Sequence, residues 1–441
     1  MKYKLKDLLE EKGYIRGPFG SALVRSELKE KGIPVYEQQH AIYNIRDFRF
    51  YIDEEKFNEM RRFCVREDDL LISCSGTVGK VTRIKKNDPI GIISQALLIL
   101  RVNKTKVFPE YLKYFFESKE GYNSIVSRSS GSVQVNIAKR EIIEGIELEV
   151  PEKEEQHRIV NILKSLDDKI ELNNAINKNL EEMAQALFKR WFVDFEFPNE
   201  NGEPYKSSGG EFEESELGLI PKGWRVGILD DLCEMIFSGG TPSTKNEAYW
   251  NGDLFWLSSG ETRNRYIIST EKRITQDGVE NSSTRLAKKY DVVIASAGQG
   301  STRGQTSICL VDTYINQSII AVRAKKGSTF PSYLFFNLST RYEELRQISD
   351  SNSIRGSLTT NTLKKLKIII PPIEIQYKIC SVLDQVINCA EYYQRQNEYL
   401  TQIRDTLLPK LMSGEIRVPV EQDHNDPDLP MVAESSVIYQ P

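Results

Sequence analysis

Pro151-Glu-Lys-Glu-Glu-Gln156-His-Arg-Ile159 begins a stretch that the chain contains twice. Its proline, glutamine and isoleucine return in Pro371-Pro-Ile-Glu-Ile-Gln376-Tyr-Lys-Ile379, which lies 220 residues later (379 − 159). Apolar residues then recur at alternating steps of three and four, which predicts the seam of a long α-helix. The seam residues are Ile159, Leu163, Leu166, Ile170, Leu180, Met183 and Leu187 in the first copy, and Ile379, Leu383, Val386, Ala390, Leu400, Ile403 and Leu407 in the second.

The ends of both expected helices are marked in the sequence. Proline in the first turn costs no hydrogen bond, and the acidic residues after Pro151 suit the positive end of a helix dipole. Gly414 is a suitable stop for the second helix, and Pro198 prevents the first from continuing. At 1.5 Å per residue, a seam from Ile159 to Trp191 is about 50 Å long. Two matching seams in one chain indicate that each helix is the other's partner.

Asn177 and Asn397 occupy equivalent positions along the two seams. In one interpretation both are buried and set the register of the helix pair, as asparagine does in coiled coils. In the other, both face solvent at a gap in the seam, because the apolar pattern is weakest there.

The stretches before the two helices share a second repeat, with an offset of 222 residues (291 − 69). Short apolar runs bounded by turn residues predict strands, a proline-led run predicts a short helix, and the alternation from Ile142 to Val150 predicts an exit strand. The matching pairs are Asp69–Ser75 with Asp291–Ala297, Ser94–Arg101 with Asn316–Arg323, and Phe108–Leu112 with Phe330–Leu334. The sequence therefore predicts two mixed α/β domains built on one plan.

Composition limits the function classes. The net charge is −4, but both globular stretches carry more Lys and Arg than Asp and Glu, which favours a polyanionic partner such as nucleic acid. The chain has no run of eighteen apolar residues and no signal peptide, so we expect no membrane span. Its six cysteines form no CxxC pair and it has three histidines. We therefore expect no structural zinc, free thiols and a cytoplasmic location.

Motifs for catalysis are weak or missing. Gly76-Thr-Val-Gly79-Lys80 lacks the spacing of a phosphate-binding P-loop, and Val81 stands where Ser or Thr would hold magnesium. Gly298-Gln-Gly300-Ser-Thr-Arg-Gly304 resembles a dinucleotide fingerprint with one residue too many. The three histidines are scattered, so a Ser-His-Asp site is not supported. We expect no catalytic residue and no cofactor in this chain.

Polar and cationic side chains instead gather in turn-rich loops at matching places of both halves. Gln and Asn pair bidentately with adenine and Arg with guanine, whereas Ser, Thr and Lys suit phosphates. The candidate DNA-binding residues are Gln38, Gln39, Ser75, Thr77, Lys80, Gln134 and Asn136 in the first half, and Thr241, Lys245, Ser259, Arg263, Thr302 and Arg303 in the second.

The order of several short motifs resembles a known family. These motifs are Ser75-Gly-Thr-Val-Gly79-Lys80, Gly131-Ser-Val-Gln134, Pro221-Lys-Gly-Trp224, Ser238-Gly-Gly-Thr-Pro242, Tyr249-Trp250, Gly252-Asp253, Trp256-Leu-Ser-Ser-Gly260 and the two Pro…Gln…Ile helix starts. In this order they resemble the DNA-specificity subunit of type I restriction-modification systems over residues 3–415. The first half departs from the pattern, because Gly17-Pro-Phe-Gly20 stands where the second half has Ser238–Pro242.

The resemblance implies an α+β fold in which two long antiparallel coiled-coil helices separate two target-recognition domains related by a pseudo-two-fold repeat. Each domain would read one half of a split, asymmetric site in double-stranded DNA, and the helices would set the unread spacer. Such a subunit is not catalytic. It docks two methyltransferase subunits and restriction/translocase subunits, which supply S-adenosylmethionine, ATP and Mg²⁺ chemistry. Helix faces outside the seam, including Trp191 and Phe192, would dock partners or cap the seam.

The expected boundaries follow from these repeats. They are residues 1–150 for the first recognition domain, 151–197 for the first helix, 198–221 for an exposed linker rich in Gly, Glu, Ser and Asn, 222–370 for the second domain, 371–417 for the second helix and 418–441 for a disordered tail. The alternatives are a coiled-coil adaptor that binds proteins, a nucleotide-dependent enzyme using Gly298–Gly304, and the specificity subunit of a modification-only system.

Overall fold

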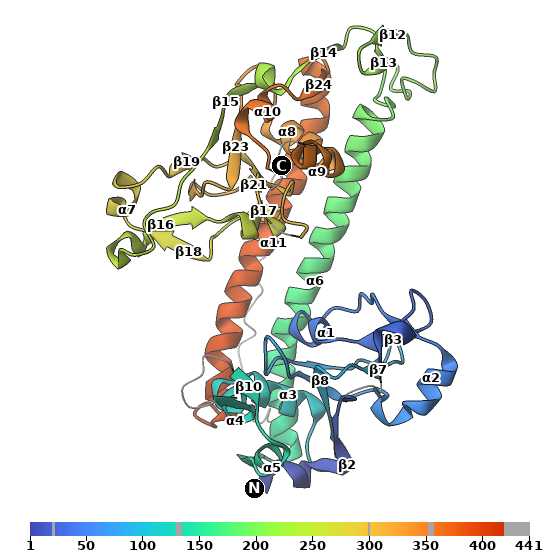
Figure 1. Ribbon diagram of the computed structural model, residues 1–441, viewed down its shortest axis with the longest axis vertical. Coiled ribbons are helices and arrows are strands. Elements are labelled where there is room, and N and C mark those ends of the chain that lie inside the picture. Colours follow the sequence, from blue (N-terminus) through green and yellow to red (C-terminus); the bar gives the residue numbers. More distant parts are fainter. Residues whose placement is uncertain (20–22, 129–134, 299, 352–356, 419–441) are drawn as a thin grey trace, which may run out of the picture. The chain divides into compact units, whose positions relative to one another are not determined.

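The computed structural model describes residues 1–19, 23–128, 135–298, 300–351 and 357–418 (Figure 1). The chain divides into two compact units. Unit 1 contains Met1–Asp168 and the chain from Thr401 onward, and unit 2 contains Lys169–Leu400. Helices α6 (Lys153–Phe192) and α11 (Ile373–Met412) each contribute one end to either unit, so unit 1 is built from two separate stretches of sequence. None of the described helices is long and apolar enough to cross a membrane.

Unit 1 is built on an antiparallel four-stranded sheet in the order β2 (Leu9–Arg16), β8 (Leu97–Val102), β5 (Leu70–Ser73) and β6 (Val81–Arg83). A three-stranded sheet follows the order β4 (Tyr51–Ile52), β3 (Ile33–Tyr36) and β7 (Ile92–Ile93), in which β3 and β7 run parallel. Two further pairs join β1 (Lys2–Lys4) to β11 (Glu147–Glu149) and β9 (Val126–Arg128) to β10 (Val135–Ile137). The helices are α1 (Gln38–Ile42), α2 (Glu54–Glu59), α3 (Pro109–Glu117), α4 (Lys119–Ile125) and α5 (Arg140–Glu144).

Unit 2 repeats and extends this plan. Its five-stranded sheet has the order β15 (Cys233–Ser238), β23 (Ile319–Ala324), β20 (Val292–Ala295), β21 (Thr306–Cys309) and β17 (Tyr266–Ile267). Its four-stranded sheet has the order β18 (Lys272–Ile274), β16 (Trp250–Leu257), β22 (Thr313–Ile315) and β19 (Arg285–Ala287). The pair β14 (Arg225–Ile228) and β24 (Lys367–Ile370) and the pair β12 (Phe212–Ser215) and β13 (Gly218–Pro221) complete the strands. The helices are α7 (Gln276–Glu280), α8 (Pro331–Thr340), α9 (Tyr342–Ser351) and α10 (Thr360–Lys364).

The internal repeat has a structural counterpart in a buried ion pair. In unit 1, Arg101 on β8 contacts both carboxylate oxygens of Asp69 at 2.8 Å. In unit 2, Arg323 on β23 binds Asp291 in the same way, at 2.7–3.2 Å. Because these four residues obey the 222-residue offset, the repeat seen in the sequence is a repeat of the fold, and the predicted α+β class is confirmed.

The repeated glutamine fastens each long helix to its own unit. Gln156 is 1% exposed, donates from Nε2 to the carbonyl oxygen of Pro151 and accepts from the N–H of Phe108, just before α3. Gln376 is also 1% exposed, donates to the carbonyl oxygen of Pro371 and accepts from the hydroxyl of Thr329 before α8. A buried carboxamide needs such partners, which explains why this residue recurs beside the proline.

The two long helices contact each other inside both units. In unit 1, Arg404 donates to Asp167 at 2.9 Å, and in unit 2, Asn173 donates to Gln396 and Asn397 at 2.8 Å. As the residue number rises along α6 it falls along α11, so the two helices (green and orange in Figure 1) run antiparallel. The buried asparagine at this contact is Asn173, whereas Asn177 is half-buried.

Some seam positions are core residues of the units and others are not. Ile159, Leu163, Ile379 and Leu383 are at most 3% exposed. Leu166, Ile170, Leu180, Leu187, Val386, Leu400 and Leu407 are half-buried. Met183 is 67% exposed, so its place in the expected seam is wrong, because its neighbour Ala184 makes the packing contact instead. In unit 1, Leu408 and Leu411 of α11 join Ile159 and Leu163 in one core.

Three local expectations need correction. The expected strand Ser94–Arg101 begins only at Leu97, in β8, because Ser94–Ala96 form the turn after β7. Residues 140–144 form helix α5, whose Ile143 is fully buried, and only Glu147–Glu149 form the exit strand. The segment after α6 is not a plain connector, since it carries the β12–β13 hairpin. The residues beyond Val418 lie outside the described part of the chain.

The hairpin segment folds because its few apolar residues are aromatic and meet at one point. Phe197 stacks on Trp224 with ring centres 5.0 Å apart, and Tyr205 stacks on the same Phe197 at 4.6 Å. Phe195 meets Trp224 edge to face at 5.6 Å. Aromatic rings bury a large area per residue, so a segment poor in apolar residues still gains enough contact to fold.

Candidate nucleic-acid interface

In unit 1, four turns lie next to one another and form what we call surface 1: Gly17–Phe19 after β2, helix α1, the β5–β6 turn (Cys74–Lys80) and the β7–β8 turn (Ser94–Ala96). The N–H of Gly17 donates to the carbonyl oxygen of Leu97 at 2.9 Å, and the N–H of Cys74 donates to that of Ala96 at 2.8 Å. The side chain of Gln38 lies over Gly76, where its Nε2 is 3.4 Å from the position of an added Cβ. Loops distant in sequence thus present their polar groups together.

The β5–β6 turn is rigidly built. The hydroxyl of Ser73 donates to the carbonyl oxygen of Thr77 at 2.6 Å and accepts from the N–H of Lys80 at 3.0 Å. Gly76 and Gly79 have φ of 60° and 83°, which favours glycine. Ser75, Thr77 and Lys80 are therefore held outward, and all three are exposed.

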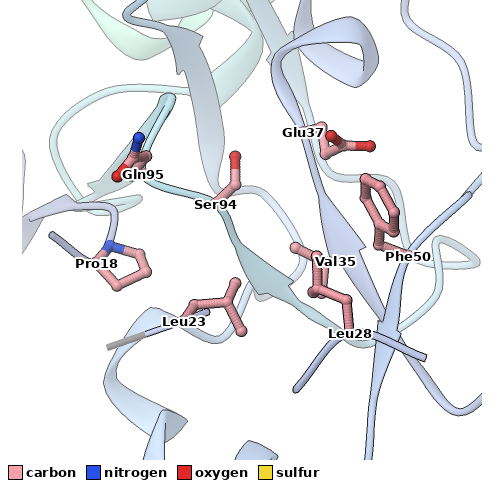
Figure 2. Close-up of a pocket in the computed structure, with 8 residues that line it drawn as sticks. All are labelled: Pro18, Leu23, Leu28, Val35, Glu37, Phe50, Ser94 and Gln95. Carbon is pink, nitrogen blue, oxygen red and sulfur yellow. The ribbon is translucent and has the colours of Figure 1, made fainter. Parts of the chain in front are cut away.

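Figure 2 shows a small pocket beside surface 1. It is lined by Pro18, Leu23, Leu28, Val35, Glu37, Phe50, Ser94 and Gln95 and has a volume of about 160 Å³. Pockets for cofactors and drug-sized ligands are typically about 300–1,000 Å³. The pocket is therefore too small to hold a nucleotide.

In unit 2, surface 2 is made by the equivalent turns: Ser238–Lys245 after β15, the 3₁₀ helix Ser259–Arg263, the β20–β21 turn (residues 296–304, of which 299 is not described) and the β22–β23 turn (Asn316–Ser318). The N–H of Ser296 donates to the carbonyl oxygen of Ser318 at 2.8 Å, as Cys74 does to Ala96. The hydroxyl of Thr241 donates to Oε1 of Gln317.

The short helix of each surface is capped in the same way by a different buried side chain. In surface 1, the N–H of Glu37 donates to Nδ1 of His40 at 2.7 Å, and His40 stacks on Phe48. In surface 2, the N–H of Ser258 donates to Oε1 of Glu261 at 3.0 Å. His40 is 0% and Glu261 3% exposed, so these two residues build the loops and do not face a ligand.

The structure places most of the first-half candidates on surface 1. Ser75, Thr77 and Lys80 are exposed there, and Gln38 and Gln39 are half-buried in α1. The buried Oε1 of Gln38 has no hydrogen-bond partner among the described residues. Asn136 lies in strand β10, and Gln134 lies outside the described residues.

The second-half candidates divide into available and engaged side chains. Lys245 is exposed and Thr241 and Ser259 are half-buried on surface 2. Arg263 forms an ion pair with Glu271, and Arg303 forms one with Asp350. Thr302 packs against Gly298, with its Cβ 3.0 Å from the position of a Cβ added there. Both arginines are therefore engaged with a carboxylate in this structure.

The list of candidates omitted two exposed residues, Gln95 and Gln317. They stand at the tips of the equivalent β7–β8 and β22–β23 turns. The signal was present in the sequence, because both follow the 222-residue offset (317 − 95) between polar neighbours and a buried strand. Arg285 was also missed; it is exposed and lies 4.2 Å from the ring centre of Phe237, next to Ser238.

The glycine-rich turn Gly298–Gly304 does not have the architecture of a nucleotide site. Dinucleotide fingerprints join a strand to a helix whose N-terminus holds the phosphates. Here β20 is followed by β21, which pairs with it antiparallel. No helix begins among the described residues of this turn, so the strand-to-helix geometry that would hold a nucleotide's phosphates is not seen there.

The end of α6 carries a larger, mostly apolar groove of about 350 Å³ in unit 2. Phe192, one of the residues that line it, is 6% exposed and packs on Trp224 and Tyr333, with ring centres 5.8 and 5.1 Å apart. Trp191 is half-buried and packs against the same core. Of the two interpretations, Phe192 therefore fits the capping role.

No group of three His, Cys, Asp or Glu residues in the described ranges could hold a metal ion. All six cysteines lie in those ranges and are free thiols. Burial raises the pKa of Cys74 to about 12, although Arg16 opposes this, so that thiol on the edge of surface 1 is kept uncharged.

Comparison with known proteins identifies the family. The family model for the type I restriction modification DNA specificity domain matches residues 1–182 and 221–402. The HindI specificity subunit of Haemophilus influenzae is 26% identical over 387 residues, which cover 74% of this chain and 81% of that protein. The MjaIX specificity subunit of Methanocaldococcus jannaschii is 26% identical over 367 residues, which cover 80% and 81%.

A solved structure has the same fold. The type I restriction-modification S subunit from M. genitalium aligns with a TM-score of 0.56 at 14% identity and covers 93% of this chain and 96% of that chain. The two segments that match the family model together span most of the sequence, one in each half of the repeat. The chain therefore belongs to the family of type I restriction-modification DNA specificity subunits and is the non-catalytic specificity subunit of such a complex.

Proposed function

We propose that the chain recognises a bipartite, asymmetric site in double-stranded DNA, with surface 1 reading one half-site and surface 2 the other. One observation carries this proposal: the same four turns are built twice on the same strand plan, but with different side chains. Because the two units share a backbone plan, we expect them to bind DNA in the same way. Because their side chains differ, we expect them to read different base sequences.

The polar groups on the two surfaces fit this role. Lys80 on surface 1 and Lys245 on surface 2 are exposed cations suited to phosphates, and Arg285 on β19 is a further exposed cation beside Phe237, next to surface 2. The same surfaces carry exposed hydroxyls and carboxamides suited to base edges, namely Ser75, Thr77 and Gln95 on surface 1 and Gln317 on surface 2.

The chemistry of modification and cleavage would then belong to other chains. We propose that the complex contains two methyltransferase subunits, which flip adenine out of the duplex and methylate it with S-adenosylmethionine. Restriction/translocase subunits that use ATP and Mg²⁺ would complete it, and a modification-only system would lack them. A DNA partner agrees with the proposed cytoplasmic location.

The test is single-molecule sequencing of methylated adenine in DNA from a host that expresses this chain with its neighbouring methyltransferase gene. A split motif methylated once on each strand, and lost when this chain is deleted, is the expected result. A continuous motif, or methylation that persists after the deletion, would contradict the proposal and favour the protein-binding adaptor. Adding or omitting the nuclease gene in the same host separates a restriction system from a modification-only one.

A further inference from the structure

We infer that Gln95 and Gln317 are base-reading residues, one for each half-site, and that Thr241 orients the second. The inference rests on the proposed function, because it assigns the specificity of the same two surfaces. Neither residue was among the candidates taken from the sequence.

The two glutamines occupy equivalent positions in the two units. Gln95 stands in the turn between β7 and β8, and Gln317 in the turn between β22 and β23. The residue before each glutamine is held by an equivalent bond: the N–H of Ser94 donates to Tyr36 at 2.8 Å and that of Asn316 to Leu257 at 3.1 Å. The residue after each is held by Cys74 or Ser296, as described above. Each glutamine is therefore an exposed residue at the tip of its turn, and backbone hydrogen bonds hold the residues on both sides of it.

A glycine packs closely against each of the two turns. A Cβ on Gly17 would lie 2.0 Å from the carbonyl oxygen of Ser94, and a Cβ on Gly239 would lie 1.9 Å from that of Ile315. The Cβ of any other residue would collide with this backbone. Glycine therefore allows the loop to pack closely against the turn that carries the glutamine. The same device appears in both units although the following residues, Pro18 and Gly240, differ.

The carboxamide of Gln317 is oriented by a hydrogen bond. The hydroxyl of Thr241 donates to Oε1 of Gln317, so the two N–H groups of Nε2 stay available. The side chain of Asn316 accepts from the N–H of Ser318 at 3.0 Å and stiffens the turn. A preoriented donor suits base edges that present acceptors in the major groove, namely N7 and O6 of guanine or O4 of thymine.

Gln95 differs in a way that predicts a different base. Within the described part of the chain its side chain makes no hydrogen bond, so both its carbonyl and its amino group are available with respect to those residues. A free carboxamide can pair bidentately with N6 and N7 of adenine. Surface 1 is therefore expected to read adenine at the position facing Gln95, and surface 2 an acceptor edge at the position facing Gln317.

The experiment maps methylated adenine for single variants of the full chain, each expressed with the methyltransferase gene. Gln317→Ala is expected to reduce discrimination about tenfold to a hundredfold at one base pair of one half-site, the range of a single lost base contact. Gln95→Ala is expected to do the same at one base pair of the other half-site. Thr241→Val frees Oε1 of Gln317 and is expected to increase methylation at sites with adenine at the Gln317 position.

Matched controls are Gln402→Ala in unit 1 and Gln276→Ala in unit 2, because both glutamines are exposed and lie outside the two surfaces. Neither should alter the motif. The half-site that each variant still reads shows that the complex has folded and assembled. An unchanged motif in Gln95→Ala or Gln317→Ala, or equal loss at both half-sites, would overturn the inference. Failure of the unmodified chain to produce a split motif would instead overturn the proposed function.

Discussion

At the scale of single residues, each unit contains a buried Asp–Arg pair. The side chain of Asp69 is 1% and that of Arg101 12% exposed. Burial raises the pKa of Asp69, and the hydrogen bonds from Arg101 oppose this by stabilising the charged form. Asp69, immediately before β5, and Arg101, near the end of β8, join these paired strands at the end opposite to the turns of surface 1.

Replacing Arg101 by Met should destabilise unit 1 by about 3–5 kcal/mol, because it leaves Asp69 buried without its partner. The measurement is hydrogen exchange of the β5 and β8 amides, which should become less protected. Lys2→Met is the control, since the ion pair of Lys2 with Glu149 is 75% and 77% exposed. Equal effects of the two substitutions would show that burial does not decide the energy of the pair.

Gly17 and Gly239 are the residues whose side-chain volume is most restricted next to the recognition surfaces. Gly17→Ala should cost about 3 kcal/mol or more in unit 1, because its Cβ meets backbone that has no free rotamer to yield. Thermal unfolding should shift downward for Gly17→Ala and for Gly239→Ala. Gly260→Ala should leave it unchanged, since the nearest atom to its Cβ is 3.9 Å away.

At the scale of elements, the contact between the two long helices in unit 1 depends on a charged cluster. Burial by itself would raise the pKa of Asp167, but Lys113 and hydrogen bonds from Arg404 and Tyr114 hold it below its usual range. A carboxyl group with a depressed pKa stabilises the fold above its ordinary titration range, and this contribution is lost as the pH falls through its folded pKa.

Arg404→Met should therefore lower the free energy of unfolding at neutral pH by about 2 kcal/mol, the range for a hydrogen bond between charged groups. The difference from the unmodified chain should shrink as the pH is lowered through the carboxyl range. Urea unfolding followed by circular dichroism at several pH values measures it. Lys164→Met, which breaks an exposed pair with Asp168, should have little effect at any pH. A pH-independent penalty for Arg404→Met would point to packing instead.

The hairpin segment after α6 packs around one aromatic side chain, Trp224. Trp224 is 5% exposed and contacts Phe192, Phe195 and Phe197. Trp224→Ala should cost about 3–5 kcal/mol in unit 2, through lost burial and the cavity left behind. The fluorescence of the remaining three tryptophans, all in unit 2, should report unfolding at lower urea. Leu219→Ala, 61% exposed, should not shift the transition.

At the scale of the whole molecule, the two units differ in the number of chain segments that form them. Unit 2 is one continuous stretch, whereas unit 1 needs residues from both ends of the chain. Leu408 and Leu411, at 6% and 2% exposure, complete the core that contains Ile159 and Leu163.

A chain that ends at Leu400 should consequently lose the stability of unit 1, although it keeps all of residues 1–168. Hydrogen exchange in β2 and β8 should accelerate, while β20 and β23 of unit 2 remain protected. A chain that ends at Val418, which keeps helix α11 with Leu408 and Leu411, is the control. Undisturbed protection in β2 and β8 of the shorter chain would show that the C-terminal helix end is dispensable for the fold of unit 1.

The sequence alone determined the long helices, the repeat of the globular parts and the family, because periodicity, proline placement and short motifs are local or repeated patterns. The tertiary structure decided what depends on contacts between distant residues. It placed Gln95 and Gln317 at the tips of the surfaces, held Arg263 and Arg303 in ion pairs, buried Asn173 rather than Asn177 between the helices, and folded the expected linker around Trp224. Each of these outcomes is set by the partner that a side chain meets in space, and a one-dimensional pattern of residue types does not name that partner.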